Sequence, residues 1–338
     1  MGTQDRLIGD PDMVDEHASD GSAPSRFVHE AAIYDSDEAF LGVAVPFLRD
    51  GVLAGVPTLL SIGARQHRLV REALGDVAGV TVLDDRYAQP FTALQLNHEM
   101  FREYVAAGVR QVRILGEVPH PGTGAPWDGW VRYEAAINHL FAAFPVWAIC
   151  PYDLRNTPPD VLVDVTRTHD RLASADGGHR ANPDYAEPAE FLAERVRREV
   201  DPLERTRPDL DLVDASPAAA RRAVAQLGRS TEVPASRVED LVVAVNEVVT
   251  NAIVHGRPPV VLRAWGVPDR VVVAVRDQGA GPADPYAGLL PDTSAGVPER
   301  HGLWMAHQLC SRVSLTRASD GFTVRLVAGT PRPMTSGA

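Results

Sequence analysis

The stretch Glu247-Val-Val-Thr-Asn251-Ala-Ile-Val-His255 decides the fold of the C-terminal half of this 338-residue chain. It lies in an apolar segment, 241–254, whose periodicity predicts a helix. Glu247 and Asn251 are one helical turn apart, so their side chains project from the same face. A carboxylate beside an amide oxygen offers the hard ligands that Mg²⁺ prefers, with phosphate oxygens and water completing the shell. We therefore expect a magnesium site on this helix.

A second motif follows a β-branched run, 271–275, that predicts a buried strand. The strand leads into Asp277-Gln-Gly279-Ala-Gly281. The two glycines allow a sharp turn close to a ligand, and Asp277 can accept a hydrogen bond from an exocyclic amine. Further on, Gly302 opens a helical stretch that runs to Leu309, and helix N-termini bind phosphate. The ordered motifs predict an ATP site.

On these motifs, residues from about 208 to 330 resemble the Bergerat-fold ATPases of the gyrase, Hsp90, histidine-kinase and MutL superfamily, and most closely the anti-sigma-factor serine kinases. The resemblance implies an α+β domain that binds ATP and Mg²⁺. It implies Glu247 as the general base, also near the metal through water, and Asn251 as the metal ligand. It implies that Asp277 binds the adenine amino group.

The same resemblance assigns further residues to the nucleotide site. Gly279 and Gly281 would form the hinge of the lid, Gly302 would belong to the phosphate loop, and Thr323 would reach the adenine. The family usually has Gly-Arg-Gly in the second glycine motif, and this chain has Arg300 at the first glycine position. The complete set of candidate nucleotide contacts is Asn251, His255, Asp277, Gly279, Gly281, Arg300, Gly302 and Thr323.

Composition narrows the function. The net charge is −12, and all 33 basic residues are arginine. No stretch resembles a basic arm or a helix-turn-helix, which argues against direct nucleic-acid binding. The absence of lysine excludes a Walker A motif, which requires Gly-Lys-Ser/Thr. The two cysteines, Cys150 and Cys310, lie in apolar contexts, and we expect buried thiols and a cytoplasmic protein without a membrane partner.

The length suggests two domains. The acidic segment 1–25 has no apolar core of a signal peptide or membrane span, and we expect a disordered tail. The expected organisation is a sensory domain at 26–175, a linker rich in Gly, Asn, Pro and charge at 176–207, the ATPase domain at 208–330, and a tail at 331–338.

In the N-terminal half, short apolar runs alternate with helical patterns. Predicted strands are 31–34, 57–62, 80–83, 112–116 and 146–150, and predicted helices are 38–53, 65–74, 93–107 and 129–143. This alternation favours an α/β domain with a parallel sheet. Ligands of such sheets bind beyond the carboxyl ends of the strands.

Three stretches give this half its own resemblance: Phe27-Val-His29-Glu-Ala-Ala-Ile-Tyr34, Gly55-Val-Pro-Thr-Leu-Leu-Ser-Ile-Gly63, and Ile149-Cys150-Pro-Tyr152-Asp153. It resembles the MEDS sensory domain, a RecA-like module without a Walker A motif that is proposed to sense small hydrocarbon derivatives. The candidate residues of the sensory site are His29, Glu117, Cys150 and Asp153. Because Asp85, Glu117 and Asp153 follow strands, we expect their cleft to repel triphosphate and to suit a neutral or cationic small molecule.

The leading hypothesis is a serine/threonine kinase of the anti-sigma type, controlled by a small molecule in the N-terminal domain. By resemblance its partners would be a sigma factor or an antagonist protein with a phosphorylatable serine, and the chain could form a homodimer. One alternative is a histidine kinase, with His29, His98 or His169 as the phosphoacceptor. Another is a catalytically silent module that switches partners by nucleotide occupancy.

Overall fold

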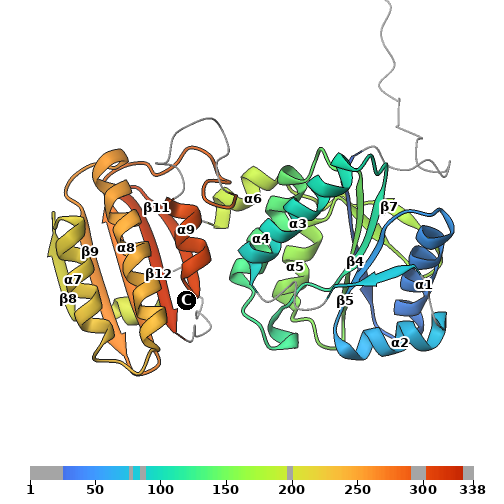
Figure 1. Cartoon of the computed structure of the whole chain (residues 1–338), viewed down its shortest axis with the longest axis horizontal. Coiled ribbons are helices and arrows are strands. Elements are labelled where there is room, and N and C mark those ends of the chain that lie inside the picture. The colour runs from blue at the N-terminus through green and yellow to red at the C-terminus, as the bar shows by residue number, and fades with distance from the viewer. Residues whose placement is uncertain (1–25, 76–78, 84–88, 196–200, 291–301, 330–338) are drawn as a thin grey trace, which may run out of the picture.

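A computed structural model describes residues 26–75, 79–83, 89–195, 201–290 and 302–329. Each half of the chain builds its own sheet, and the two halves lie side by side (Figure 1). The predicted tails at 1–25 and 331–338, Asp85 and Arg300 lie outside the described residues. None of the described helices is long and apolar enough to cross a membrane.

The N-terminal sheet has seven strands in the order β3-β2-β4-β5-β1-β6-β7. All neighbouring pairs are parallel except β6 and β7. The strands are β1 (Val28–Tyr34), β2 (Thr58–Ser61), β3 (Val80–Val82), β4 (Val112–Gly116), β5 (Val146–Asp153), β6 (Arg171–Ala173) and β7 (His179–Ala181). The predicted parallel sheet is confirmed, and the sequence analysis missed β6 and β7, which are three residues long each.

Helices cover both faces of this sheet. The helices are α1 (Asp37–Leu53), α2 (Ala64–Leu74), α3 (Pro90–Ala106), α4 (Asp128–Leu140), α5 (Pro159–Thr168) and α6 (Pro188–Arg195). Neighbouring residues of β1 serve two cores, because strand side chains alternate: Ala31 packs with α3, α4 and α5, and Ala32 packs with α1. Burial on both faces explains why the strands appear in the sequence as short apolar runs.

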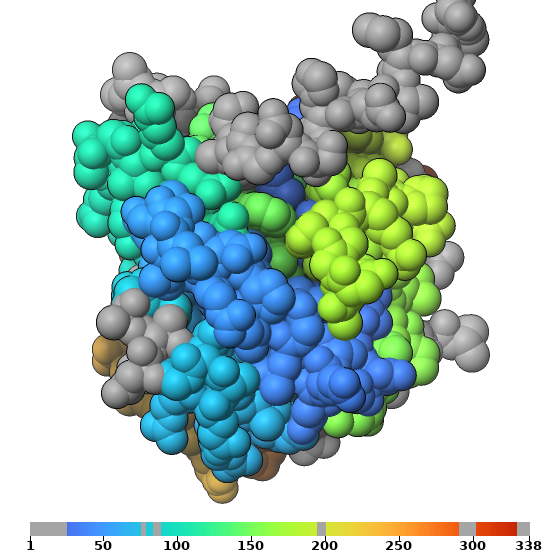
Figure 2. Space-filling view, turned by 90° about the vertical axis from the view of Figure 1, so that its right-hand side faces the viewer, coloured from blue at the N-terminus to red at the C-terminus, as the bar shows by residue number. Residues whose placement is uncertain are grey.

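The α1 helix shows how local sequence sets an element boundary. Ser36 is its N-cap, and its hydroxyl accepts a hydrogen bond from the Ala39 amide at 3.2 Å. Asp37 and Glu38 follow in the first turn, where acidic groups favour the positive end of the helix dipole. Figure 2 looks onto the end of the molecule formed by α1 and α2 (blue to cyan) and the region of β7 (yellow-green).

The C-terminal sheet has five antiparallel strands in the order β11-β12-β10-β9-β8. These are β8 (Leu210–Val213), β9 (Val261–Val267), β10 (Arg270–Asp277), β11 (Arg312–Ala318) and β12 (Gly321–Gly329). The helices α7 (Pro217–Gly228), α8 (Ala235–His255) and α9 (Gly302–Leu309) share one apolar core with this sheet. The predicted α+β fold is confirmed, and the predicted helix 241–254 lies inside α8.

The predicted linker, 176–207, packs on both halves. Phe191 and Leu192 of α6 are buried in the core of the N-terminal domain, while Leu203 packs on the other face of the C-terminal sheet. There Glu204 pairs with Arg325. Apolar and charged contacts therefore hold its described parts on the two sheets, and we propose that the N-terminal domain continues to the end of α6.

The two halves also touch directly. Leu289, which follows the glycine motif at 277–281, is fully buried in the core of the N-terminal domain. Tyr286 stacks on His139 of α4, with ring centroids 4.2 Å apart and an angle of 5° between the planes. Asp128 of α4 pairs with Arg312. The helix α4 thus contacts the C-terminal half, as does α3, whose Phe91 packs on His307 of α9.

Candidate functional site

The candidate nucleotide site is built around α8. Its apolar face, including Leu241, Val248 and Val249, packs in the core, which fixes the direction of the remaining side chains. Glu247 and Asn251 both face the start of α9. A Cβ placed on Gly302 would lie 3.0 Å from Glu247 Oε2 and 3.1 Å from Asn251 Nδ2. The structure therefore brings Glu247 and Asn251 close to Gly302, which lies about 50 positions further along the sequence.

Glu247 is held by a neighbour on its own helix. Its Oε1 accepts a hydrogen bond from Asn246 Nδ2 at 3.0 Å. Its other carboxylate oxygen, Oε2, is the atom nearest to Gly302. This arrangement positions one carboxylate oxygen while the second faces the motif at which the phosphates are expected.

Asp277 ends β10 and is 6% exposed. Its Oδ1 accepts hydrogen bonds from the Gly279 amide at 2.6 Å and the Arg257 amide at 3.2 Å. A Cβ on Gly256 would lie 2.4 Å from the Asp277 carboxyl carbon, so only glycine allows α8 to end this close to the strand. Backbone contacts thus fix the carboxylate at the mouth of the turn.

The turn itself needs its glycines. Gly281 has φ +70°, and a Cβ there would lie 2.4 Å from the ring of Phe322. At Gly279 a Cβ would meet Asp277 Oδ1 at 2.6 Å. Side chains at either position would displace the aromatic ring or the carboxylate.

These motifs surround one cleft with a volume of ≈ 800 Å³. Four of the predicted residues line it: Asn251, His255, Asp277 and Gly281. The floor is apolar and includes Val248, Val275, Leu303, Phe322 and Val324. A deep apolar cleft with a few convergent polar groups has the size and chemistry of a site for a small molecule.

Thr323 is not brought to this cleft. It lies on β12 between Phe322 and Val324, which both line the cleft. Successive residues of a strand point to opposite faces, so Thr323 lies on the face that carries Arg325 and its partner Glu204. The structure does not support the expectation that Thr323 contacts adenine.

Two lining residues come from the other half of the chain. His139 and Leu140, at the end of α4, border the cleft together with Tyr286 and Leu290. No sequence pattern connects these positions, because the contact depends on how the two halves dock. These two residues could therefore not be predicted from the sequence.

The donor set fits a nucleotide with Mg²⁺. Asn251 presents an amide and Glu247 a carboxylate toward Gly302, which begins α9. The amide and carboxylate oxygens are hard ligands, and the backbone N–H groups at the start of a helix suit phosphate. Asp277 supplies an acceptor for an amine at the apolar end of the cleft.

In the N-terminal domain, the site of a phosphate loop is filled by a side chain. Glu117, which follows β4, accepts a hydrogen bond from the Gly63 amide at 2.6 Å. Gly63 is the N-cap of α2, the position at which a helix N-terminus would hold phosphate. Burial raises the pKa of Glu117, the Gly63 amide opposes that rise, and the negative Asp153 adds to it. The carboxylate occupies the anion position itself.

One of the carboxylates expected to border an anionic cleft is paired with an arginine. Arg155 binds Asp153 through two nitrogens, at 2.7 and 2.6 Å. Asp37, which was not part of the expected cleft, pairs with both Arg155 and Arg65. The pairing of Asp153 weakens the expected repulsion of triphosphate. The positions of acidic residues after strands do not reveal which arginines the fold places beside them.

The remaining sensory candidates, His29 and Cys150, lie elsewhere in this domain. They are completely or almost completely buried between the sheet and α4, and Cys150 Sγ lies 3.5 Å from His29 Nε2. They meet Glu134 and His169, which the sequence analysis did not assign to this site. Burial and Glu134 raise the pKa of the Cys150 thiol well above its usual value. Burial and His29 lower the pKa of His169.

Cys150 also borders a small cavity of ≈ 20 Å³ in the N-terminal core. Its walls are mostly apolar and include Phe101, Ile114, Ile137 and Phe141. The polar groups there, Asn97 and Tyr133, bind each other at 2.9 Å. A cavity of this volume has room for about one water molecule, and its lining is mostly apolar.

Comparisons with known proteins agree with this division. Residues 28–170 match the MEDS family, the MEthanogen/methylotroph, DcmR Sensory domain. Residues 212–328 match the histidine kinase-like ATPase domain.

Two individual proteins are similar to parts of the chain. The transcriptional repressor DcmR of Methylorubrum extorquens is 27% identical over 157 residues, which cover 42% of this chain and 58% of that protein. The chain thus spans little more than half the length of this relative. The crystal structure of the RsbU and RsbW domains of a Mycobacterium tuberculosis protein has 26% identity and a TM-score of 0.26, over 39% of this chain and 35% of that chain. By its family matches, the chain joins a MEDS sensory domain at residues 28–170 to a histidine-kinase-like ATPase domain at residues 212–328.

Proposed function

We propose that this protein is an ATP- and Mg²⁺-dependent protein serine/threonine kinase of the anti-sigma type whose activity is controlled by the sensory domain. One observation carries the proposal. Asn251 of α8 and Asp277 of β10 line one cleft, and Glu247 of α8 and Gly302 of α9 lie close together beside Asn251. The histidine-kinase-like ATPase match supports ATP as the ligand.

Each residue then has a distinct role. Asp277 would accept a hydrogen bond from the adenine amine, and its own backbone contacts hold it ready to do so. Asn251 would hold Mg²⁺, which when bound neutralises charge on the phosphates. Glu247 would accept the proton of the substrate hydroxyl, which is general-base chemistry. The Asn246 contact keeps one of its oxygens in place for that step.

The sensory domain would act on the segment that closes the cleft. Residues 283–290 follow the hinge, and their described side chains Tyr286, Leu289 and Leu290 pack on the N-terminal core. A ligand that changes the position of α4 would change how this segment is held. Such a ligand controls output only by binding the two arrangements with different affinities.

The alternatives have less support. A histidine kinase needs an accessible phosphoacceptor, and His29 and His169 are completely buried. His98 lies on α3, within the sensory domain, and its ring packs against Phe141 and Phe144. A silent partner-switching module would use the same cleft without Glu247 as a base, so only an activity measurement separates it from a kinase.

The partner is proposed to be a sigma factor or an antagonist protein that carries a serine. DcmR is a transcriptional repressor, which supports a role in transcription for a protein that shares its sensory domain.

The test uses partners co-purified with the full chain from its native host and incubated with labelled ATP and Mg²⁺. We expect label on a serine or threonine of the partner, because the proposed role of Glu247 is to accept a proton from an alcohol. Label on a histidine of this chain would support the histidine kinase. Nucleotide-dependent release of the partner without any label would support the silent module and overturn the kinase.

The regulatory part has its own variant. Tyr286→Ala removes the stacking on His139 and should change the rate of phosphotransfer or its response to the sensory ligand, and ATP affinity is measured alongside because Tyr286 also lines the cleft. Leu53→Ala is the matched control, because Leu53 is 78% exposed at the end of α1. Unchanged rate and response in Tyr286→Ala would argue against control through this contact.

A further inference from the structure

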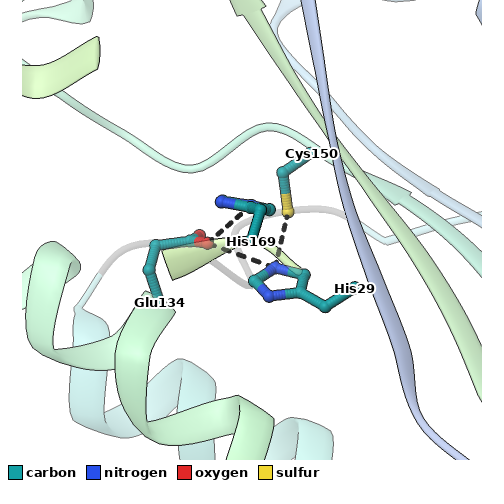
Figure 3. Close-up of side chains that lie close together, drawn as sticks. All are labelled: His29, Glu134, Cys150 and His169. Carbon is teal, nitrogen blue, oxygen red and sulfur yellow. Dashed lines mark hydrogen bonds and ion pairs between the residues drawn. The ribbon is translucent and has the colours of Figure 1, made fainter. Parts of the chain in front are cut away.

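Four metal-ligating side chains meet inside the sensory domain, away from the nucleotide cleft. They are His29 of β1, Glu134 of α4, Cys150 of β5 and His169, which follows α5 (Figure 3). Their nitrogen, oxygen and sulfur atoms all lie within 4.8 Å of one another. The two histidines and Glu134 are 0% exposed and Cys150 is 5% exposed. Water does not compete for this cluster.

The histidine rings are oriented by groups outside the cluster. His169 Nδ1 donates a hydrogen bond to the Val165 carbonyl at 2.8 Å. His29 Nδ1 lies 3.1 Å from Asn138 Oδ1. Outer contacts of this kind fix the tautomer of a metal-binding histidine and leave its Nε2 as the ligand.

The orientation of Asn138 is itself determined. Its Nδ2 donates to the carbonyls of Glu134, at 3.1 Å, and Thr168, at 2.7 Å. A flipped amide would place an oxygen against two carbonyl oxygens. The Oδ1 atom therefore faces His29, and the proton of that imidazole lies on Nδ1.

The inward-facing nitrogen and oxygen atoms are consequently acceptors, and the thiol of Cys150, 3.5 Å from His29 Nε2, is the donor among the four groups. His29 Nε2 and His169 Nε2 lie 3.2 and 3.1 Å from the same oxygen, Glu134 Oε2. Among the described residues, no hydrogen-bond donor is found for either oxygen of Glu134 or for the Nε2 of His169. Buried acceptors that face one another without a donor are costly, and a cation between them removes the cost.

The distances also fit a metal. A tetrahedral Zn²⁺ separates its nitrogen and oxygen ligands by about 3.4 Å and its sulfur and nitrogen ligands by about 3.6 Å, given bond lengths of about 2.0–2.3 Å. The observed pairs are 3.1 and 3.2 Å for nitrogen and oxygen, and 3.5 Å for sulfur and nitrogen. The other three pairs of ligand atoms also lie within 4.8 Å, so none of them would have to close by more than about 1 Å.

We propose that His29, Glu134, Cys150 and His169 bind one divalent transition-metal ion, with Zn²⁺ as the best match to this ligand set. Binding transfers the Cys150 thiol proton to water and leaves a thiolate, a carboxylate and two neutral imidazoles around the ion. A mixed nitrogen, oxygen and sulfur set suits zinc and its neighbours and does not suit Mg²⁺. The site is therefore chemically separate from the Mg²⁺ site at Asn251.

The ion would connect the sheet to a helix that contacts the ATPase domain. Glu134 lies on α4 between Asp128, which pairs with Arg312, and His139, which stacks on Tyr286. His29 and Cys150 belong to neighbouring strands, β1 and β5. An ion at the cluster would tie α4 to these strands.

The test is metal binding to the full chain without nucleotide. After chelation and dialysis, titration with Zn²⁺ should show about one tight equivalent per chain. Co²⁺ should give a thiolate-to-metal charge-transfer band that Cys150→Ser abolishes. Cys310→Ser is the matched control and should keep the band, because Cys310 is a buried thiol of the other domain. Asn138→Ala, which removes only an outer contact, should weaken affinity by about 10–100-fold.

Wild-type protein decides the question even where a buried variant fails to fold. A folded chain that binds no tight equivalent of Zn²⁺ or Co²⁺ overturns the proposal. A charge-transfer band that survives Cys150→Ser, or that disappears in Cys310→Ser, also overturns it. Asn251→Ala should leave the band unchanged, which separates this site from the nucleotide site.

Discussion

In each domain a helix begins at a glycine that lies beside a glutamate carboxylate, but the two carboxylates are placed differently. At Gly63 the carboxylate of Glu117 accepts a hydrogen bond from the glycine amide, so a side chain of the protein occupies the anion position at the start of α2. At Gly302 the carboxylate of Glu247 lies beside the start of α9, next to a cleft of ≈ 800 Å³. A helix N-terminus can bind an external anion only where its N–H donors are not already bound by a side chain of the protein.

The largest expected effect is at the open site. Glu247→Gln should lower phosphotransfer by roughly 10²–10⁴-fold with little change in ATP affinity, because a base is lost and the shape is kept. Steady-state rates and calorimetry measure the two quantities. Glu239→Gln, an exposed position on the same helix, is the control and should behave as wild type. A Glu247→Gln protein as active as wild type would refute the general-base role.

The next effect concerns binding. Asn251→Ala and Asp277→Asn should each weaken Mg·ATP binding by about 2–3 kcal/mol, or roughly 30–150-fold, since each removes a metal-linked or charge-assisted contact. Calorimetry on the full chain checks this, with Asp211→Asn on the exposed strand β8 as the control. ATP binding that persists at wild-type affinity in the double variant would place the nucleotide elsewhere, the filled site at Gly63 included.

The smallest effect is at the filled site. The pKa of Glu117 is raised in the folded protein, so the folded state holds this proton more tightly than the unfolded state. Its contribution to stability is therefore greatest in acid and is lost as the pH rises above the ordinary glutamate range of about 4.3. Glu117→Gln, which keeps an acceptor for Gly63, should be the more stable protein at neutral pH.

Denaturant unfolding at several pH values measures this difference. The gap between Glu117→Gln and wild type should widen from acid to neutral pH, whereas Glu72→Gln, exposed on the same helix α2, should show no such trend. A gap that is constant with pH would mean that the charge of Glu117 is not what matters at this helix start.

Sequence alone determined what depends on local pattern. The period of the apolar residues predicted α8 and the alternation of the N-terminal domain, because each element buries a face of fixed spacing. The glycines at 279 and 281 predicted a sharp turn after β10, and Gly281 there has φ +70° and lies close to Phe322. The absence of lysine excluded a Walker A motif whatever the fold.

The tertiary structure decided which of these residues meet. Thr323 points away from the cleft because strand alternation assigned that face to its neighbours, a register that the motif did not specify. Glu134 and His169 joined His29 and Cys150 only when α4 and the end of α5 packed on the sheet. Tyr286 and Leu289 docked on α4 from the other half of the chain. Contacts of this kind join residues far apart in sequence, and no local periodicity carries them.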